Sequence, residues 1–587
     1  MTVALHDLLP AGLRRSWAVD GTCPDLDLYS LFRARQISDL HHTAIIDAKG
    51  KLCYTALDRK VRCLATGLAG LGIGPGDVVG VQLPSGRDAV IADLALAALG
   101  AVALPFPVGR GSQEARCLLR RAEAVAVIAA VEHRGSHHAA DLRDLRDRAG
   151  ELPALRHVIA AGKGGTAPEG TILLSALLRS DPAAFVPARP DPDSAARILV
   201  SSGSESEPKM IAYSHNALAG GRGNFLASLM PDGTRPRCLF LVPLASAFGS
   251  NGTAVTLARH GGTLVLLDHF TPEAAVAAVR AHRPTHILGV PTMIRMMLDR
   301  LEVEAEAEAG AAAETTGGSE SAYAAPDAAP GAGEFTAGRL PAPTAVIVGG
   351  APLDETTAES ASRAFGCPVV NLYGSADGVN CHTGLGSAHP EADSTGIAAG
   401  RPDPRVADIR IVDAETHARL PDGEVGEIIA RGPMTPMCYV ASPDLDARYR
   451  TPEGWVRTGD LGLLDEEGVL HVVGRLKDIV IRGGANISPA EVERELSSHA
   501  QVRDIVCVGV PDEVMGERLA ACVVPRGAQD PTLGSLGDHL TRRGLERRKH
   551  PERLLLLTEL PLTPAGKPDR AALRARLARV AVSAATA

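Results

Sequence analysis

The sequence predicts an α/β protein with a large N-terminal domain of several subdomains, built on mainly parallel sheets, and a small α+β C-terminal domain. Three observations support this fold class. Helical and strand patterns alternate over most of the chain, which favours parallel strands covered by helices. The 587 residues are too many for one hydrophobic core. After about residue 409 the pattern changes to short antiparallel hairpins.

The first elements show the alternation clearly. Residues 54–72 have the pattern of an amphipathic helix closed by glycine, and residues 77–84 have that of a buried strand. The most apolar segment, 89–108, contains Asp93 and reaches Pro105 too early to span a bilayer, so we expect a buried helix and then a strand. Further short apolar strands are expected at 124–131, 237–244, 262–268, 286–291, 344–350 and 368–374. Ligands of such folds gather at the carboxyl ends of the strands.

One segment interrupts the pattern. Residues 302–338 are rich in Glu, Ala, Gly, Ser and Pro and cannot bury enough apolar surface to become ordered. We predict a flexible acidic insertion, in which the first residues can extend the preceding helix; a spacer is favoured over a partner-binding segment. The chain from about residue 476 has the length of a compact domain. We therefore divide it into an N-terminal domain of residues 1–475 and a C-terminal domain of residues 476–587.

Composition argues against several classes of protein. The net charge of -9 is unlike that of a general nucleic-acid binder, which is usually basic. The N-terminus has no long apolar run after a basic stretch, so we expect no signal peptide and no membrane partner. The ten cysteines show neither CxxC pairs nor metal-ligand spacing, which is typical of reduced thiols in a cytoplasmic protein.

Six short motifs follow one another in order. They are SSGSESEPKM at 201–210, VGGAPL at 348–353, NLYGSADG at 371–378, GWVRTGDLG at 454–462, GRLKD at 474–478 and PLTPAGKPDR at 561–570. Alone, each also fits a turn, a core residue or a solvated surface. Together they resemble the acyl-adenylate-forming superfamily of acyl-CoA synthetases, peptide-synthetase adenylation domains and luciferases. The resemblance runs from about Tyr54 to Arg570.

The resemblance implies two reactions in one active site. A carboxylate attacks ATP to give acyl-AMP and pyrophosphate, and a thiol then displaces AMP after the mobile C-terminal domain has swung. Lys567 is implied in the first step, Lys477 is the hinge, and His215 closes the phosphate-loop motif as a third catalytic candidate. Asp460 is implied to accept the ribose hydroxyls, and Arg475 to contact the nucleotide. The remaining implied nucleotide residues are Gly349, Gly350, Ala351, Tyr373, Gly374, Ser375, Ala376 and Asp377.

The phosphate loop departs from the family pattern. Its residues are Ser202, Gly203, Ser204, Glu205, Ser206, Glu207 and Lys209. Glu205 stands where the family has a hydroxyl, Ser206 replaces a glycine, and Glu207 adds a second carboxylate. A carboxylate can only accept hydrogen bonds. At about 5 Å and an effective dielectric near 20, each carboxylate–phosphate pair costs on the order of 3 kcal/mol.

A second departure affects magnesium. Ala376 replaces a threonine of the family, and Asp377 replaces the glutamate that helps to hold Mg²⁺. The aspartate is shorter by about one bond, ~1.5 Å, so Asp377 is a weak metal candidate. Both departures concern the triphosphate, whereas the groups implied to hold AMP remain. This contrast leads to the hypothesis that the enzyme mainly performs thioester formation on acyl-AMP from a separate adenylating enzyme; the use of ATP and Mg²⁺ stays open.

The substrate predictions rest on small and basic residues. Ser246, with Ala247, Phe248 and Gly249, follows a strand where the family often has a larger gating residue, which favours a roomy pocket for a bulky carboxylic acid. The alternative is that another side chain fills the gap. For CoA the candidates are Gly483, Gly484, Arg547, Arg548 and Lys549; a solvated helix end is the alternative for the basic cluster.

Three other functions are compatible with the sequence. One is a complete ATP-dependent acyl-CoA synthetase, and another is an adenylating enzyme that loads a separate carrier protein. The third is a non-catalytic binding protein that keeps the fold, against which the retained Asp460, Arg475 and Lys567 weigh. The many Ala, Gly and Arg residues suggest a GC-rich genome and, from that, a role in secondary metabolism.

Overall fold

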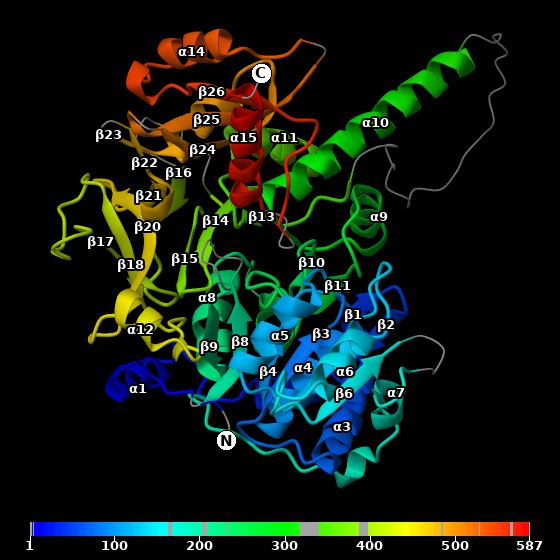
Figure 1. The fold of residues 1–587 in the computed structure, drawn as a ribbon. Coiled ribbons are helices and arrows are strands. Elements are labelled where there is room, and N and C mark those ends of the chain that lie inside the picture. The colour runs from blue at the N-terminus through cyan, green and yellow to red at the C-terminus, as the bar shows by residue number, and fades with distance from the viewer. Residues whose placement is uncertain are drawn as a thin grey trace.

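The computed structural model describes residues 3, 5–162, 167–201, 208–231, 233–316, 340–386, 397–482, 485–512, 514–527, 529–563 and 567–585. Side chains are described for the same residues except 308–316, 485, 486 and 580–585. Two large sheets form the N-terminal body, and the elements after residue 480 gather at one end of the molecule, beside β13 and α11 (Figure 1).

The first large sheet has mainly parallel strands. In spatial order they are β15 (Val379–His382), β14 (Val369–Ser375), β13 (Ala345–Gly349), β12 (His286–Gly289), β10 (Arg237–Phe240), β11 (Thr263–Leu266), β1 (Thr43–Asp47) and β2 (Gly50–Cys53). The two edge strands, β15 and β2, pair antiparallel with their neighbours, and the other pairs are parallel. The strands between them are short, apolar and buried, as strands covered on both faces must be.

The second large sheet follows the same plan. Its order is β19 (Cys438–Tyr439), β9 (Met210–Ser214), β8 (Ala195–Val200), β4 (Val102–Pro105), β3 (Val78–Gln82), β5 (Ala126–Ala130), β6 (His157–Ala161) and β7 (Ile172–Leu173). Strands β8 and β9 pair antiparallel, and the phosphate-loop motif joins them. The short strand β19 pairs with β9 and brings a segment from more than 200 residues away beside that loop.

Two smaller sheets complete the fold. The third consists of β16 (Ile397–Gly400), β21 (Leu470–Arg475), β20 (Val456–Leu464), β18 (Gly426–Arg431) and β17 (Asp408–Val412), all antiparallel. The fourth consists of β23 (Ala485–Ile487), β22 (Val480–Arg482), β25 (Gly516–Pro525) and β24 (Val502–Asp512), with β26 (Arg553–Leu556) on β25. The predicted division after residue 475 falls between these two sheets. The expected fold class, a large mainly parallel α/β domain with a small C-terminal domain, is confirmed.

Helices cover the sheets. They are α1 (Ala11–Val19), α2 (Leu28–Ser38), α3 (Tyr54–Gly70), α4 (Arg87–Leu99), α5 (Ser112–Arg121), α6 (His138–Asp147), α7 (Leu174–Leu177), α8 (Arg222–Ala227), α9 (Pro272–His282), α10 (Pro291–Thr316), α11 (Glu355–Phe365), α12 (Pro443–Tyr449), α13 (Pro489–Ser497), α14 (Leu533–Arg542) and α15 (Arg570–Ala585). Side-chain caps begin several of them; Asp354 caps α11 and Ser488 caps α13. Within the described ranges, no helix combines the length and hydrophobicity that crossing a bilayer requires.

Helix α10 includes the first residues of the predicted insertion. As expected, these residues extend the preceding helix, which continues to Thr316 and extends away from the body in Figure 1. Glu and Ala, which dominate residues 302–314, are strong helix formers. Glu304 also pairs with Arg300 one turn earlier and with Arg280 of α9. Residues 317–339 lie outside the described part of the chain.

A buried ion pair joins α4 to the strand that leads into the phosphate loop. Arg197 of β8 lies 2.7 Å from Asp93 of α4, and the two side chains are only 5% and 9% exposed. Arg197 also donates to the Leu244 carbonyl, and Thr253 donates to Asp93. The network therefore connects the second sheet to the segment that follows β10, in which the acyl-pocket candidates lie.

Replacing Asp93 should destabilise the fold strongly. We expect Asp93→Ala to lose about 3–5 kcal/mol, because it leaves the Arg197 charge buried and unpaired. The measurement is urea unfolding followed by circular dichroism. Asp88→Ala on the same helix is the control; it removes an exposed pair with Lys49 and should change stability by about 0–1 kcal/mol. Equal small losses for both variants would contradict this role of the buried pair.

Candidate active site

Asp460 is the centre of the predicted nucleotide site. It lies on β20, is 3% exposed, and faces Arg475 across the ladder to β21. The Tyr373 hydroxyl donates to Oδ2 over 2.8 Å, and Arg475 Nε donates to Oδ1 over 2.7 Å. Each carboxylate oxygen has a second lone pair. Asp460 therefore keeps acceptor capacity for hydroxyl donors such as those of a ribose.

The charges around Asp460 reinforce one another. Burial, together with the Asp460 carboxylate, raises the pKa of the Tyr373 hydroxyl, so Tyr373 remains a hydrogen-bond donor. The negative charge of Asp460 also raises the pKa of the Arg475 guanidinium. The three side chains together are electrically neutral and are held in one geometry by two hydrogen bonds.

Lys567 reaches this site from the C-terminal domain. A short hairpin presents it: Leu562 bridges to Pro568, and the Thr563 N–H donates to the Lys567 carbonyl over 2.7 Å. Its side chain packs over Gly350, where a β-carbon would lie 3.3 Å from Lys567 Cε. Gly350 also has a φ of +83°, which favours glycine. The structure thus brings two candidate residues from different domains into contact.

The environment of Lys567 alters its proton affinity. The pKa of Lys567 is lowered from 10.5 to about 8, mainly because its ammonium is buried and also because Arg475 is positively charged nearby. The negative charge of Asp460 opposes this effect. At neutral pH the ammonium therefore remains mostly protonated and can stabilise an anion such as a phosphate oxygen.

Asp377 and its neighbours form a second cluster. Asp377 is 8% exposed; Ser375 Oγ donates to its Oδ2 over 2.7 Å and the Tyr439 hydroxyl donates to its Oδ1 over 2.6 Å. Lys209 Nζ lies 3.4 Å from the same Oδ1. The Ala376 carbonyl accepts from the Tyr213 hydroxyl over 2.8 Å. Both the carboxylate and the adjoining backbone are therefore held by side chains from β9 and β19.

The phosphate loop itself is described only at its two ends. Ser202, Gly203, Ser204, Glu205, Ser206 and Glu207 lie outside the described residues, so their predicted roles stay predictions. At the ends, the Ser201 N–H donates to the Lys209 carbonyl over 2.9 Å. Arg110 donates to the Ser201 carbonyl and Arg121 to the Pro208 carbonyl, over 3.2 and 3.1 Å. Two arginines thus hold the ends of the loop.

The acyl-pocket candidates form a tight turn after β10. Ser246 Oγ donates to the Pro243 carbonyl over 2.8 Å and accepts from the Gly249 N–H over 2.9 Å. A β-carbon at Gly249 would lie 1.9 Å from the Pro243 oxygen, so only glycine fits. Ala247 and Phe248 pack, partly buried, against the main core. The Ser246 hydroxyl is engaged within the turn, and the roomy acyl pocket remains a prediction.

His215 is a buried histidine at the end of β9. Its Nδ1 accepts from the Leu28 N–H over 3.2 Å, which ties β9 to the start of α2. Burial lowers the pKa of His215 to about 4, so the imidazole is neutral at physiological pH. Its described hydrogen bond serves packing of the N-terminal segment, and the catalytic assignment of His215 stays a prediction.

The hinge and CoA candidates lie on the C-terminal side. Lys477 is in the short helix η4 (Leu476–Asp478), with Nζ 5.8 Å from the centre of the Tyr449 ring. Gly483 and Gly484 lie outside the described residues. The basic cluster forms the short helix η5 (Arg547–Lys549), in which Arg547 and Arg548 are exposed.

Ion pairs distinguish the members of the basic cluster. Lys549 Nζ lies 2.7 Å from a Glu491 carboxylate oxygen and 2.8 Å from the other, so its charge is largely balanced. Arg548 pairs with the exposed Glu546 over 2.6 Å. An ion pair between two exposed side chains is weak, so another anion can readily replace Glu546 beside Arg548. Arg547 and Arg548 are therefore better placed than Lys549 to meet a soluble phosphate.

Two tyrosines near Asp377 and Lys209 were not predicted from the sequence. Tyr439 and Tyr449 contact Asp377, Lys209 or both, yet neither belongs to one of the six motifs. Tyr439 lies 62 residues from its partner Asp377. No local pattern marks a residue that reaches a site through a long-range strand pair such as β9 with β19.

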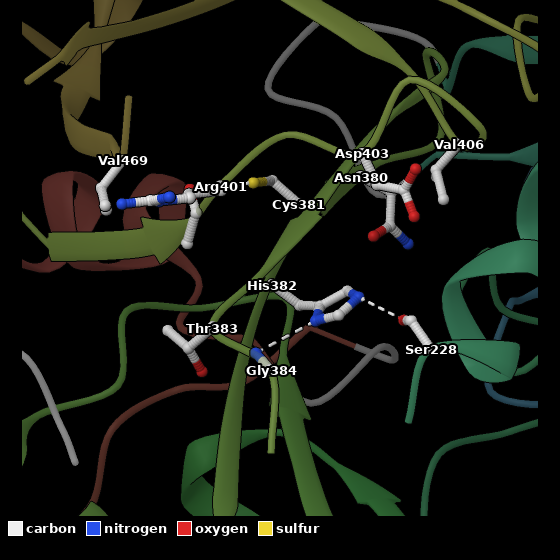
Figure 2. A pocket seen from close by; sticks show the side chains of 11 residues that line it. Ser228, Asn380, Cys381, His382, Thr383, Gly384, Arg401, Asp403, Val406 and Val469 are labelled. Atoms are coloured by element: carbon white, nitrogen blue, oxygen red, sulfur yellow. Dashed lines mark hydrogen bonds between the residues drawn. The ribbon is translucent and has the colours of Figure 1, made fainter. Parts of the chain in front are cut away.

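A cavity of about 530 Å³ lies beside the edge strand β15 and was also missed (Figure 2). Its lining includes Asn380, His382, Asp403 and Ser228. His382 Nδ1 accepts from the Gly384 N–H, so its Nε2 donates to Ser228 Oγ over 2.9 Å. Asn380 Oδ1 is buried and has no hydrogen-bond partner among the described residues. The cavity adjoins the hairpin of β14 and β15, which carries Tyr373 and Asp377, on the side of the edge strand β15.

The two charges near Lys567 should shift its titration in opposite directions. We expect a pKa near 8 in the native protein, a higher value in Arg475→Met and a lower value in Asp460→Asn. Acetylation by acetic anhydride between pH 6 and 10, quantified by peptide mass spectrometry, measures this. The exposed Lys51 is the internal reference. Reactivity of Lys567 that follows Lys51 at every pH would contradict the described surroundings.

Comparison with known protein families agrees with this arrangement of residues. A model described as "AMP-binding enzyme" matches residues 33–440. A second, described as "AMP-binding enzyme C-terminal domain", matches residues 491–567. Both therefore match in the order that the motifs predicted, and the first alone covers more than half of the chain.

Individual relatives match over nearly their whole length. Triostin synthetase I of Streptomyces triostinicus is 33% identical over 558 residues, which cover 93% of this chain and 95% of the relative. A 2-hydroxy-7-methoxy-5-methyl-1-naphthoate–CoA ligase of Streptomyces carzinostaticus is 31% identical over 545 residues, 91% and 90% of the two chains. The solved structure of the amide bond synthetase McbA from Marinactinospora thermotolerans matches with a TM-score of 0.77 at 27% identity, over 94% and 99% of the chains. This chain belongs to the family of AMP-binding enzymes and is a ligase of the acyl-adenylate-forming type.

Proposed function

We propose that this enzyme makes the CoA thioester of a bulky carboxylic acid from its acyl-AMP, and that a separate adenylating enzyme supplies most of that acyl-AMP. The observation that carries the proposal is the contrast between two parts of the site. Asp460 and Arg475, which hold the nucleotide in this proposal, and the hinge residue Lys477 are retained, whereas the residues for the triphosphate are altered or engaged elsewhere.

The intact group supports chemistry on an adenylate. In the transfer, the CoA sulfur forms a bond to the acyl carbon, the bond from that carbon to the phosphate oxygen breaks, and AMP leaves with both electrons. The thiol proton passes to solvent. Asp460 has free lone pairs for the ribose hydroxyls. Arg475, paired with the same carboxylate, is the cation that the proposal places beside the nucleotide.

The altered group argues against productive use of ATP. Glu205 and Glu207 put two carboxylates in the sequence of the phosphate loop; at about 5 Å from a phosphate, each would repel it by on the order of 3 kcal/mol. Asp377 is already bonded to Ser375, Tyr439 and Lys209.

The acid is inferred from the turn after β10 and from one relative, and the acceptor thiol is inferred from helix η5. The small residues of the turn after β10 favour a bulky acid, and the relative named as a naphthoate–CoA ligase supports an aryl acid. Arg547 and Arg548, exposed on η5, support CoA as the thiol. A separate carrier protein is the alternative acceptor, because its phosphopantetheine arm carries the same thiol.

A complete ATP-dependent acyl-CoA synthetase is the second candidate. One observation favours it: Lys567, which the family uses to join carboxylate and α-phosphate, lies against Gly350 of the nucleotide segment. A protein that had lost the first reaction would be under no requirement to keep a lysine there, unless the lysine also serves the second reaction.

Thioester should form from acyl-AMP and CoA but not from the free acid with ATP. We would incubate the purified protein with 1-naphthoic acid, ATP, Mg²⁺ and CoA, and separately with synthetic naphthoyl-AMP and CoA. Mass spectrometry measures the thioester. Reactions without enzyme and with Asp460→Ala correct for spontaneous transfer from the reactive anhydride. Thioester in both mixtures would establish the complete synthetase; enzyme-dependent thioester in neither would refute both ligase functions for this acid.

Restoring the loop should restore ATP binding. We expect Glu205→Thr with Ser206→Gly to increase ATP affinity by about tenfold or more, since it removes one carboxylate and restores the hydroxyl and the glycine of the family pattern. Calorimetry with ATP and with AMP measures the effect, and the affinity for AMP should not change because AMP lacks the outer phosphates. Unchanged ATP affinity would mean that the obstacle to ATP lies elsewhere in the site.

A further inference from the structure

Lys209 and Asp377 form an ion pair that is almost completely shielded from solvent. Nζ of Lys209 lies 3.4 Å from Oδ1 of Asp377, and the side chains are 12% and 11% exposed. Lys209 is at the end of the phosphate-loop motif, and Asp377 lies in the turn between β14, which carries Tyr373, and β15. The pair therefore lies between the loop for the phosphates and the segment for the nucleotide.

Two aromatic rings surround the Lys209 ammonium. Its Nζ lies 3.9 Å from the centre of the Tyr449 ring and 5.4 Å from that of the Tyr439 ring. The ring centres are 6.0 Å apart and the rings are tilted by 53°. Aromatic faces attract an ammonium, most strongly when water is excluded. The Lys209 ammonium thus has the surroundings that proteins use to bind a monovalent organic cation, namely a carboxylate and two aromatic rings.

The remaining contacts of Asp377 are hydrogen-bond donors. Tyr439 donates to Oδ1 and Ser375 donates to Oδ2. Burial, followed by the charge of Asp377, raises the pKa of the Tyr439 hydroxyl, so it stays protonated. Both carboxylate oxygens are therefore engaged before any ligand arrives.

These residues do not fit a magnesium ion. Mg²⁺ requires near-octahedral oxygen ligands at about 2.0–2.1 Å and gives up water reluctantly. Among the described residues, the groups around Asp377 are its own carboxylate, two hydroxyls that already donate to it, two ring faces and an ammonium. A divalent ion at Oδ1 would have to displace Lys209 from both the carboxylate and the rings. The family resemblance implies a metal-holding carboxylate at Asp377, and the structure disagrees with it.

We propose that the Lys209 ammonium takes the place of a divalent cation at Asp377, so that the site of this enzyme carries a built-in cation and works on acyl-AMP without Mg²⁺. The inference rests on the proposed function, because acyl-AMP lacks the β- and γ-phosphates that a divalent ion would bridge. Tyr439 and Tyr449 act as positioning residues that hold the ammonium in this place.

Direct metal binding tests the inference without any turnover. Mn²⁺ is added to the full-length protein with saturating AMP, and free Mn²⁺ is measured by electron paramagnetic resonance. In the wild type we expect weak binding that Asp377→Asn does not change. In Lys209→Met we expect binding at least about fivefold tighter, since the carboxylate loses its ammonium, and we expect Lys209→Met with Asp377→Asn to lose this gain.

Lys51→Met is the matched control. It removes the same charge from an exposed residue of β2, at the opposite edge of the first sheet from β15, and should leave Mn²⁺ binding unchanged. Circular dichroism verifies the fold; if Lys209→Met does not fold, Lys209→Gln replaces it. Wild-type Mn²⁺ binding that weakens in Asp377→Asn would overturn the proposal, and so would a Lys209 variant without an Asp377-dependent gain.

A second readout separates this inference from the proposed function. Thioester formation from naphthoyl-AMP should change less than about twofold between excess Mg²⁺ and excess EDTA, because no bound divalent ion takes part. Loss of this activity in EDTA would overturn the inference while leaving the thioester function intact. Absence of thioester under both conditions would instead refute the proposed function, and the Mn²⁺ titration would still decide the role of Lys209.

Discussion

The carboxylate of Asp460 accepts hydrogen bonds from Tyr373 and Arg475, and these two contacts hold the active site together. Tyr373 belongs to the first large sheet, whereas Asp460 and Arg475 belong to the third. Arg475 is also the last residue before the link to the C-terminal domain. A buried carboxylate without its partners is strongly destabilising, by about 3–5 kcal/mol. The buried charge of Asp460 therefore stabilises the contact between the two sheets. Lys567 lies close enough for the same charge to raise its pKa.

The cations of the site divide into two groups with different surroundings. Arg475 and Lys567 lie around Asp460, where the lowered pKa of Lys567 reflects burial beside another positive charge. Lys209 lies around Asp377, enclosed by two tyrosine rings. Tyr449 is also 5.8 Å from Lys477 Nζ, so one ring lies close to the lysine of the phosphate loop and to that of the hinge. In the proposed function the first group lies on the AMP side of the site and the second on the side of the outer phosphates.

Much of the scaffold was predictable because local patterns determine it. The buried strands and the amphipathic helix α3 follow from their hydrophobic periodicity. Helix α13 likewise begins with a local signal, because Ser488 caps it and Pro489 is its first residue. For the insertion, the sequence predicted that its first residues can extend the preceding helix but not how far. Helix propensity and the Glu304 ion pairs extend α10 to Thr316.

The sequence by itself determined the family and the order of the motifs, and it predicted Asp460, Arg475 and Lys567 as site residues, because short motifs keep their residue types and spacing. Only the tertiary structure decided which side chains meet. Tyr439 reaches Asp377 because β19 pairs with β9, and Lys567 reaches Gly350 because one domain packs on the other. Such contacts depend on strand register and long-range packing, which hydrophobic pattern and motif spacing do not encode residue by residue.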